Sequence, residues 1–333
     1  MTDQIKFASG LHVFGSTADR YVLSGYKPSV PIPDMIKAAA KVPDLKGVEL
    51  VETWHVRQDN ADEILGLLQQ AGLQLSMLVP DLWAQAKWGN GSFTAKDPKI
   101  RKEAVETVKR AMDVAAQTGC NLVDVWLGQD GYDYCFQSDY IKAWGWIIEC
   151  FAECAAHNPN VIVGMEYKIK EPRTHCHVST IDRQLMLYER VGAKNLGVVL
   201  DVGHALEGYE SMAEVVALCK FFGDRLVYLH LNDNYRLWDD DMAVGSVHLI
   251  EYLELLYWLE RTGYKGWYSL DIFPYRDDGV GMATESIQWI KDLRRVMFHI
   301  GMDKIAEVIE SGDAARASRL VREGMFSLAR VPA

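Results

Sequence analysis

Eight short apolar runs recur along this chain, and a longer stretch with helical spacing separates each run from the next. The runs are rich in leucine and β-branched residues and are nearly continuous, with little alternation between apolar and polar positions. Strands that are covered on both faces have this composition, which is typical of parallel sheets with helices packed on them. The predicted strands cover residues 5–14, 47–51, 73–79, 121–127, 161–167, 196–202, 226–231 and 267–273.

Amphipathic patterns occupy the segments between these runs. In the segment 99–118, Val105 and Met112 belong to one apolar stripe, and Asp97 followed by Pro98 provides a helix start. Eight strands that alternate with helices predict a closed parallel barrel, that is, an α/β fold of the (β/α)8 TIM-barrel type. The other predicted helices are 61–71, 139–156, 180–191, 211–222, 248–262 and 281–299.

An open, doubly wound sheet is the alternative fold. Such a sheet usually carries a glycine-rich phosphate loop after its first strand, and GLHVFG at 10–15 lacks the GxGxxG spacing. We therefore expect one barrel catalytic domain over residues 1–300, followed by a C-terminal helical extension over residues 301–333. This amphipathic extension follows the eighth strand, so it either clasps a neighbouring subunit or covers the bottom of the barrel.

The bulk properties exclude several classes of protein. A net charge of −11 over 333 residues disfavours general binding to nucleic acid or to an anionic membrane. No apolar run is long enough for a membrane span, and the start MTDQIKF does not have the pattern of a signal peptide. The six cysteines contain no CxxC pair, so we expect reduced thiols in a cytoplasmic protein.

Metal-ligating side chains end four consecutive predicted strands. Glu166, Asp201, His230 and Asp271 follow one another at intervals of 35, 29 and 41 residues, about one strand–helix unit each. The carboxyl ends of all strands meet at one rim of a barrel, so these side chains should converge. Any one of them alone would be interpreted as a salt-bridge partner. The four together predict a site for a divalent cation, because buried carboxylates need a positive partner.

A second set of ligand-type residues lies close to the first in sequence. His204 comes three residues after Asp201, and the segment HLNDNYRLWDDD ends with Asp239 and Asp241. With a bridging acid, these residues would hold a second metal roughly 4 Å from the first. The alternative interpretation of the DDD run is a solvated acidic loop.

Lys168 lies two residues after Glu166, so strand alternation places both side chains on the same face. A lysine beside a cation site can orient a substrate oxygen and stabilise negative charge that develops on it, which makes Lys168, Glu166 and Asp239 the catalytic candidates. The alternative is that Lys168 is simply the ion-pair partner of Glu166.

The neighbouring KEPRTHCH segment carries weaker signals. Arg173 is either a loop salt-bridge residue or a substrate contact, and we favour the structural role. His175 and His177 flank Cys176, but a zinc site needs more soft ligands than this segment offers. We expect both histidines at the surface.

Large aromatic residues gather near the predicted strand ends. Most aromatic side chains belong to cores, but the C–H faces of sugar rings also stack well on indole rings. The candidate substrate contacts are Trp126 as a cavity wall, together with Trp83, His12 and Glu52. The complete group of aromatic residues near the rim is Phe14, Trp54, Trp83, Trp88, Trp126 and Trp238.

These motifs together resemble the xylose isomerase-like superfamily of barrels, over nearly all of residues 5–275. The closest similarity is to two-metal aldose–ketose isomerases such as xylose and rhamnose isomerase. Glu166-Tyr-Lys168, followed by EPR, is similar to their metal glutamate and catalytic lysine. Asp201-Val-Gly-His204 is similar to their acid-x-x-His pair, and Asp239, Asp241 and Asp271 to further ligands. His230, in place of a carboxylate, is the choice seen in rhamnose isomerases.

The sequence also departs from the xylose isomerase pattern. After strand two that family has a ring-opening histidine, whereas GVELVETW has none in register. His12 stands where the family has a tryptophan, and the long C-terminal arm is absent. These departures bear on the identity of the sugar more than on the chemistry.

The resemblance implies an aldose–ketose isomerase that depends on Mn²⁺, or on Mg²⁺ or Co²⁺, with two ions per subunit, and that acts on an unphosphorylated sugar. Hydrogen would move between C1 and C2. The main alternative is a ketose 3-epimerase of the same fold, which usually needs one metal. A DNA-repair nuclease and a non-catalytic sugar-binding barrel are weaker alternatives. We expect no nucleic-acid or membrane partner, and a homo-oligomer, either a dimer or a tetramer.

Overall fold

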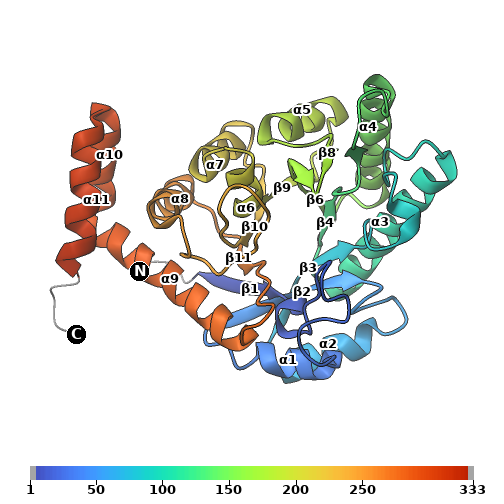
Figure 1. The fold of residues 1–333 in the computed structure, drawn as a ribbon, viewed down its shortest axis with the longest axis horizontal. Helices are drawn as coiled ribbons and strands as arrows, with labels where there is room; N and C mark the ends of the chain where they lie inside the picture. Colours follow the sequence, from blue (N-terminus) through green and yellow to red (C-terminus); the bar gives the residue numbers. More distant parts are fainter. Residues whose placement is uncertain (1–4, 329–333) are drawn as a thin grey trace.

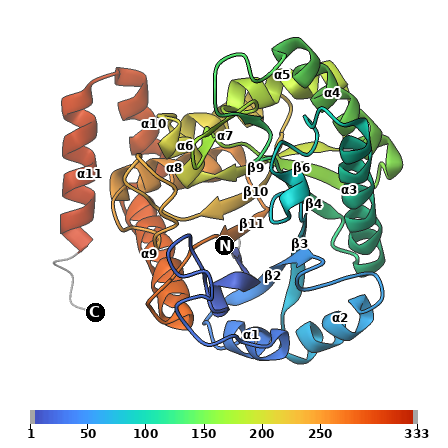
Figure 2. The ribbon, with the colours of Figure 1, turned by 45° about the vertical axis from the view of Figure 1, so that its right-hand side comes forward.

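The computed structural model describes residues 5–328 of the chain. Within these residues, eight parallel strands close into a barrel in the order β1-β11-β10-β9-β6-β4-β3-β2. Helices surround the strands (Figures 1 and 2), which confirms the predicted (β/α)8 TIM barrel. The strand bounds are β1 Lys6–Gly10, β2 Leu45–Glu52, β3 Gln74–Pro80, β4 Leu122–Trp126, β6 Ile162–Glu166, β9 Leu196–Asp201, β10 Leu226–Leu231 and β11 Trp267–Leu270.

All seven helices predicted within the barrel are present, with ends that differ by no more than about two residues from the predicted ones. Two more helices were not predicted: α1 (Ile32–Ala39), which follows the first strand, and the short α6 (Val202–Glu207), which follows β9 directly and carries His204. The predicted seven are α2 Ala61–Gln70, α3 Pro98–Thr118, α4 Tyr140–His157, α5 Ile181–Val191, α7 Met212–Phe221, α8 Leu249–Thr262 and α9 Gly279–Ile300.

Local sequence explains where α3 begins and ends. The side chain of Asp97 accepts a hydrogen bond from the backbone N–H of Lys99 at 2.8 Å, and Pro98 occupies the first turn. Gly119 ends the helix with φ of 73°, a conformation that glycine adopts without the steric cost of a Cβ. The predicted start at Asp97–Pro98 is therefore confirmed.

The first predicted strand is too long. The strand β1 ends at Gly10, and residues Leu11–Phe14 form a 3-10 helix, η1, which turns the chain at the barrel rim. A small three-stranded sheet in the loops after β4 and β6 was also not predicted. It consists of β5 (Gly131–Tyr132), β8 (Thr174–Cys176) and β7 (Lys170–Glu171), paired antiparallel; a second 3-10 helix, η2, spans Ala86–Trp88.

The barrel has apolar packing on both faces of its strands. The main core lies between the strands and the surrounding helices. Inside the barrel, Met77, Val79, Leu122, Val199 and Tyr228 form a separate, smaller cluster. All six residues of β9 are buried, which is why the strand sequences are nearly continuous apolar runs.

The C-terminal extension forms two helices, α10 (Met302–Ser311) and α11 (Ala314–Leu328). They stand as a hairpin to one side of the barrel, next to α9 (Figures 1 and 2), so the extension does not cover the barrel bottom. Gly324 allows this contact, because a Cβ there would lie 2.3 Å from Cγ1 of Ile300. Residues 1–4 and 329–333 of the two predicted domains lie outside the described residues.

None of the helices formed by residues 5–328 is both long enough and apolar enough to cross a membrane. All six cysteines are free thiols, and Cys150 and Cys154 are buried on the core face of α4.

Candidate active site

Four ligand-type side chains from consecutive barrel strands converge at one rim. Glu166 ends β6, Asp201 ends β9, His230 lies near the end of β10, and Asp271 follows β11. One potential ligand atom from each of these residues lies within 4.8 Å of those from the other three. Nδ1 of His230 is 2.9 Å from Oε2 of Glu166 and 3.7 Å from Oδ2 of Asp271. The structure thus brings together the four residues that the strand ends predicted, here called the rim cluster.

The buried charges of the rim cluster suit a cation. Burial raises the pKa of Asp201 to about 7. Burial alone would lower the pKa of His230. The negative charges of Glu49 and Glu166 have a larger effect than burial and raise that pKa well above its usual range. A protonated imidazole therefore supplies positive charge among the buried carboxylates, and a divalent cation fits the same oxygen and nitrogen donor set.

The carboxylate of Glu49 is a site residue that the sequence analysis missed. It lies on β2, where its Oε2 is 3.1 Å from Nε2 of His230, and the hydroxyl of Ser269 donates a hydrogen bond to its other oxygen. The available signal was an acidic residue in the middle of an apolar strand sequence, GVELV.

Asp124 of β4 is a second missed residue with the same signal. It is completely buried, and among residues 5–328 neither of its carboxylate oxygens has a hydrogen-bond partner. Burial, and then the neighbouring charge of Glu166, raise the pKa of Asp124 well above its usual range. Together with Glu49, it brings additional carboxyl groups beneath the rim cluster.

The second predicted ligand set lies beside the first, and its side chains contact Glu166 and Lys168. Nδ1 of His204 is 2.9 Å from Oε1 of Glu166, and its Nε2 is 3.3 Å from Oδ2 of Asp239. Asp239 is no part of a solvated acidic loop, because only 16% of its side chain is exposed and the ammonium of Lys168 donates to it at 2.5 Å. Its Oδ1 is buried and has no hydrogen-bond partner within residues 5–328.

Asn232 connects the two sets, and the sequence analysis also missed it. Its amide nitrogen donates to both oxygens of Asp201, at 3.2 and 3.0 Å, and to Oδ1 of Asp241 at 3.1 Å. The residue is fully buried just after β10. The signal was its place in HLND, directly after a predicted strand. Burial, and then the charges of Asp239 and Asp271, raise the pKa of Asp241.

Lys168 is not the ion-pair partner of Glu166. Its ammonium binds Asp239 and Glu171 and lies 5.2 Å from the centroid of the Trp126 ring. Burial would lower the pKa of Lys168, but the carboxylates of Asp239 and Glu171 outweigh it and raise the pKa well above its usual range. The side chain, only 4% exposed, therefore presents a permanent positive charge to the site.

A cavity of about 980 Å³ opens above the rim cluster. His12, Trp83 and Trp126, three of the predicted substrate contacts, line it. Glu52 does not, and this prediction is wrong: Val51 faces the cavity, so alternation turns Glu52 outwards, where its Oε1 lies 4.0 Å from Nε of Arg110 on α3.

The aromatic residues near the rim divide into two groups. Trp54 and Trp238 line the cavity together with Trp83 and Trp126. Phe14 and Trp88 instead belong to the main core, where both are buried. The rim aromatics are therefore wall residues in four cases and packing residues in two.

His12 reaches the rim cluster because η1 turns the chain after β1. Its Nε2 lies 3.1 Å from Oδ1 of Asp271, and its ring stacks on Phe273 at a centroid distance of 4.5 Å. Burial would raise the pKa of Asp271, but the close contact with His12 and the charge of His230 lower that pKa.

The KEPRTHCH segment lies largely outside the cavity. As expected, Arg173 makes a loop salt bridge, with its Nε 2.9 Å from Oδ2 of Asp133. His175 is exposed, but His177 is buried beside Tyr132 and Ser138, so its predicted surface position is wrong. The small sheet β5-β8-β7, which was not predicted, covers His177.

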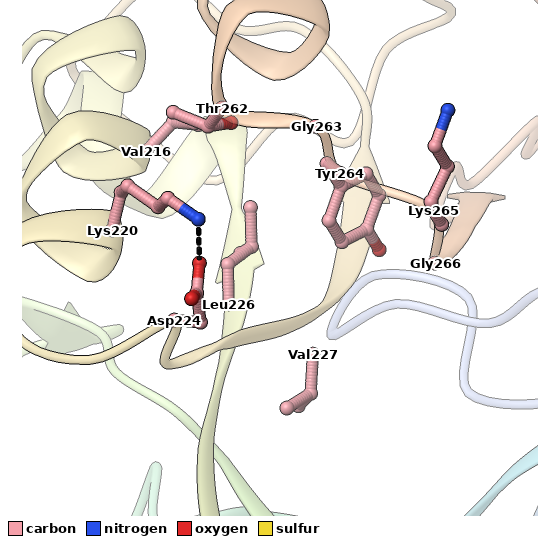
Figure 3. A pocket seen from close by; sticks show the side chains of 10 residues that line it. All are labelled: Val216, Lys220, Asp224, Leu226, Val227, Thr262, Gly263, Tyr264, Lys265 and Gly266. Atoms are coloured by element: carbon pink, nitrogen blue, oxygen red, sulfur yellow. Dashed lines mark hydrogen bonds and ion pairs between the residues drawn. The ribbon is translucent and has the colours of Figure 1, made fainter.

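A smaller hollow of about 370 Å³ lies at the opposite end of β10, between α7 and α8 (Figure 3). Its charged residues include Lys220 and Asp224, which form an ion pair at 2.5 Å. The amino-terminal face of a TIM barrel serves stability rather than catalysis. The rim cluster, at the carboxyl ends of the strands, is therefore the candidate active site.

Comparison with known proteins agrees with this geometry. The model of the xylose isomerase-like TIM barrel family matches residues 36–293. Among curated proteins, the xylose isomerases of Thermus thermophilus and Thermus caldophilus are each 26% identical over 224 residues. These matches cover 66% of this chain and 56% of each relative, so the chain spans just over half of their length.

Solved structures show the same fold. A xylose isomerase domain protein from Alicyclobacillus acidocaldarius superimposes with a TM-score of 0.67 at 15% identity, covering 88% of this chain and 99% of that one. D-Psicose 3-epimerase from Clostridium cellulolyticum H10 superimposes with a TM-score of 0.64 at 16% identity, covering 88% and 99%. With more than three quarters of its length matched by the family model, the chain belongs to the xylose isomerase-like TIM barrel family.

Proposed function

We propose that this protein is a divalent-metal-dependent aldose–ketose isomerase that acts on an unphosphorylated sugar. The observation that carries the proposal is the position of Lys168. Its buried ammonium lines the same cavity as Glu166, His230 and Asp271 of the rim cluster and is held by carboxylates from two different loops. A fixed cation beside a metal site suits a reaction in which negative charge develops on a substrate oxygen.

The donor set fits one divalent cation at the rim cluster. Glu166, Asp201, His230 and Asp271 would hold it. A second ion would take His204, Asp239, Asp241 and a bridging acid. The mixture of oxygen and nitrogen donors without sulfur suits Mn²⁺, Mg²⁺ or Co²⁺. Such ions, when bound, polarise carbonyl and hydroxyl oxygens as Lewis acids.

The chain's own residues account for the remaining requirements. Lys168 donates a hydrogen bond to the oxygen that alternates between carbonyl and hydroxyl as hydrogen moves between C1 and C2. Trp126, packed against Lys168, and Trp83 exclude water from that side. This arrangement is compatible with a hydride shift and with an enediol route, since both move one hydrogen between adjacent carbons.

A ketose 3-epimerase is the second candidate, and one observation favours it. Within the described chain, the rim cluster is the group whose ligand atoms gather for an ion, whereas Asp239 of the second set is engaged by Lys168 and His204. Similar structures also include proteins named 3-epimerases. In that reaction a proton leaves C3 and returns on the opposite face, and Lys168 has no direct part.

A substrate panel separates the two candidates. Free and phosphorylated aldoses and ketoses are incubated with the Mn²⁺-loaded protein, and products are identified by chromatography. We expect an aldose–ketose pair of unphosphorylated sugars to interconvert, with no inversion at C3. A ketose that yields only its C3 epimer, with solvent deuterium incorporated at C3, would overturn the isomerase and establish the epimerase.

We also propose that the protein works as a homo-oligomer, a dimer or a tetramer, with a small sugar as its substrate. The support is the hairpin of α10 and α11, where Ile309 and Phe326 are 41% and 63% exposed. Exposed apolar side chains on a helical hairpin favour association. Light scattering of the intact chain tests this, and a monomer at all concentrations would contradict it.

A further inference from the structure

Three tryptophans form a continuous aromatic wall that leads from the catalytic lysine to the edge of the cavity. The ring of Trp126 lies 5.2 Å from Nζ of Lys168, and Trp83 packs edge-on against Trp126 at a centroid distance of 5.2 Å. Trp54 follows at 5.6 Å from Trp83, tilted by 57°. Trp54 is 46% exposed, so the outer end of this wall offers an open indole surface.

The wall begins beside Glu166 of the rim cluster, at Trp126 on the neighbouring strand, and continues along the other side of the barrel. Trp126 ends β4, Trp83 follows β3 and Trp54 follows β2, whereas the rim cluster comes from β6, β9, β10 and β11. A cavity of about 980 Å³ lies between them, near the upper end of the range of about 300–1,000 Å³ for small-molecule sites. The space therefore exceeds what one sugar ring at the rim cluster fills.

A buried carboxylate fixes the outer part of the wall. Asp81, only 2% exposed, accepts hydrogen bonds from Nε1 of Trp54 at 3.0 Å and from the backbone N–H groups of Trp83 and Ala84 at 3.2 and 2.9 Å. The side chain of Gln85 donates to it as well, at 3.3 Å. The hydrogen bonds from the backbone N–H groups to Asp81 are explained by turn formation alone. The hydrogen bond from Nε1 of Trp54 also holds the exposed indole ring in a fixed orientation.

The turn that positions Trp54 contains a strained backbone conformation. Thr53 has φ of 76°, a left-handed conformation that is unfavourable for a β-branched residue. The turn is held by the N–H of Thr53, which donates to the carbonyl of Val56 at 2.8 Å, and by the N–H of Val51, which donates to Nδ1 of His55 at 3.0 Å. Strain that the surroundings maintain in this way is concentrated at ligand sites.

We propose that Trp54 and Trp83 form a subsite for a second sugar ring, attached to the ring that binds at the rim cluster. The substrate class is then a reducing disaccharide or another aldose that carries a glycosyl group. The occupant is not an anion, because the cavity lining is rich in carboxylates, and it presents C–H faces, because the polar edge of Trp54 is already bound to Asp81. This inference rests on the proposed function for the ring at the rim cluster.

Calorimetric binding to the Mg²⁺-loaded protein tests the subsite without relying on turnover. The probes are D-glucose compared with cellobiose and maltose, and D-xylose compared with xylobiose. We expect at least one disaccharide to bind about tenfold more tightly than its monosaccharide. Trp54→Ala should abolish that difference and leave monosaccharide affinity unchanged. Trp289→Ala on α9 is the matched control, since Trp289 is 40% exposed but lies outside the cavity.

Two results would overturn the subsite. One is that no disaccharide binds more tightly than its monosaccharide. The other is that Trp54→Ala weakens both kinds of sugar equally or neither of them. Failure of the proposed function looks different: no aldose–ketose interconversion is seen with any sugar, while the tenfold preference and its loss in Trp54→Ala persist.

Discussion

The ammonium of Lys168 and the carboxylate of Asp239 lie 2.5 Å apart, although 71 residues separate them in the sequence. Lys168 follows β6 and Asp239 belongs to the loop after β10, so the pair joins two loops above the rim cluster. Asp239 in turn is 3.3 Å from Nε2 of His204. The ion pair therefore links the proposed catalytic lysine to the proposed second metal set, and a change in either residue affects both.

Replacing Lys168 with methionine should lower kcat by about 10²–10³, because a preorganised donor to a developing oxyanion contributes about 3–4 kcal/mol to the transition state. KM should change less, since the metal ligands still bind the sugar. Lys170→Met is the matched control: Lys170 is close in sequence but pairs with Glu207 and lies outside the cavity. A near-normal kcat for Lys168→Met, with metal content equal to that of the wild type, would remove this residue from the mechanism.

Metal removal should abolish activity, because seven ligand-type side chains meet at one rim and the buried carboxylates lose their counter-charge. After EDTA treatment and dialysis, Mn²⁺ should restore turnover better than Ca²⁺, which prefers more oxygen ligands at longer distances. Mn²⁺ at a hundredfold excess over Kd should also raise the free energy of unfolding by about 2.7 kcal/mol. The midpoint temperature of thermal unfolding should therefore rise. Full activity after metal removal verified by elemental analysis would contradict the proposal.

The two proposed metal sites should respond differently to substitution. Asp271→Asn removes a ligand of the rim cluster, so it should weaken binding of the first ion and lower the thermal midpoint. Asp239→Asn should leave the first ion bound and lose turnover. Metal analysis at saturating Mn²⁺ checks both variants. One ion per subunit in the wild type, together with an active Asp239→Asn, would favour the epimerase.

Acid should destabilise the folded protein partly through His177. Burial, and then the charge of Arg183, lower the pKa of His177 to about 4, whereas an imidazole in the unfolded chain titrates near 6.5. Between these values the unfolded chain takes up a proton that the folded protein does not. The stabilisation is therefore complete above about pH 6.5 and is lost as the pH falls towards 4.

Urea unfolding at pH 7 and pH 4.5 measures this effect. The loss of stability between the two pH values should be smaller in His177→Asn than in the wild type, by about 1–3 kcal/mol. His175→Asn is the control, because that imidazole lies two residues away on β8 and is exposed. If both variants show the wild-type loss, His177 does not carry the effect.

The strands and most helices follow from the sequence because burial on both faces and amphipathic spacing are local patterns. The same reasoning located Glu166, Asp201, His230 and Asp271, since strand ends in a parallel barrel share one rim. It missed Glu49 and Asp124, whose side chains point into the barrel from within apolar strands. It misplaced Glu52, because the local sequence does not say which alternate residues of β2 face inwards.

The sequence by itself determined the barrel, the family and the four residues of the rim cluster, because strand order and strand ends are set by patterns along the chain. Only the tertiary structure decided that Lys168 pairs with Asp239, that Asn232 bridges Asp201 and Asp241, and that Trp54 faces the cavity. These relationships join loops that follow different strands. Their geometry depends on barrel closure and on the strained turn at Thr53, which no local pattern records.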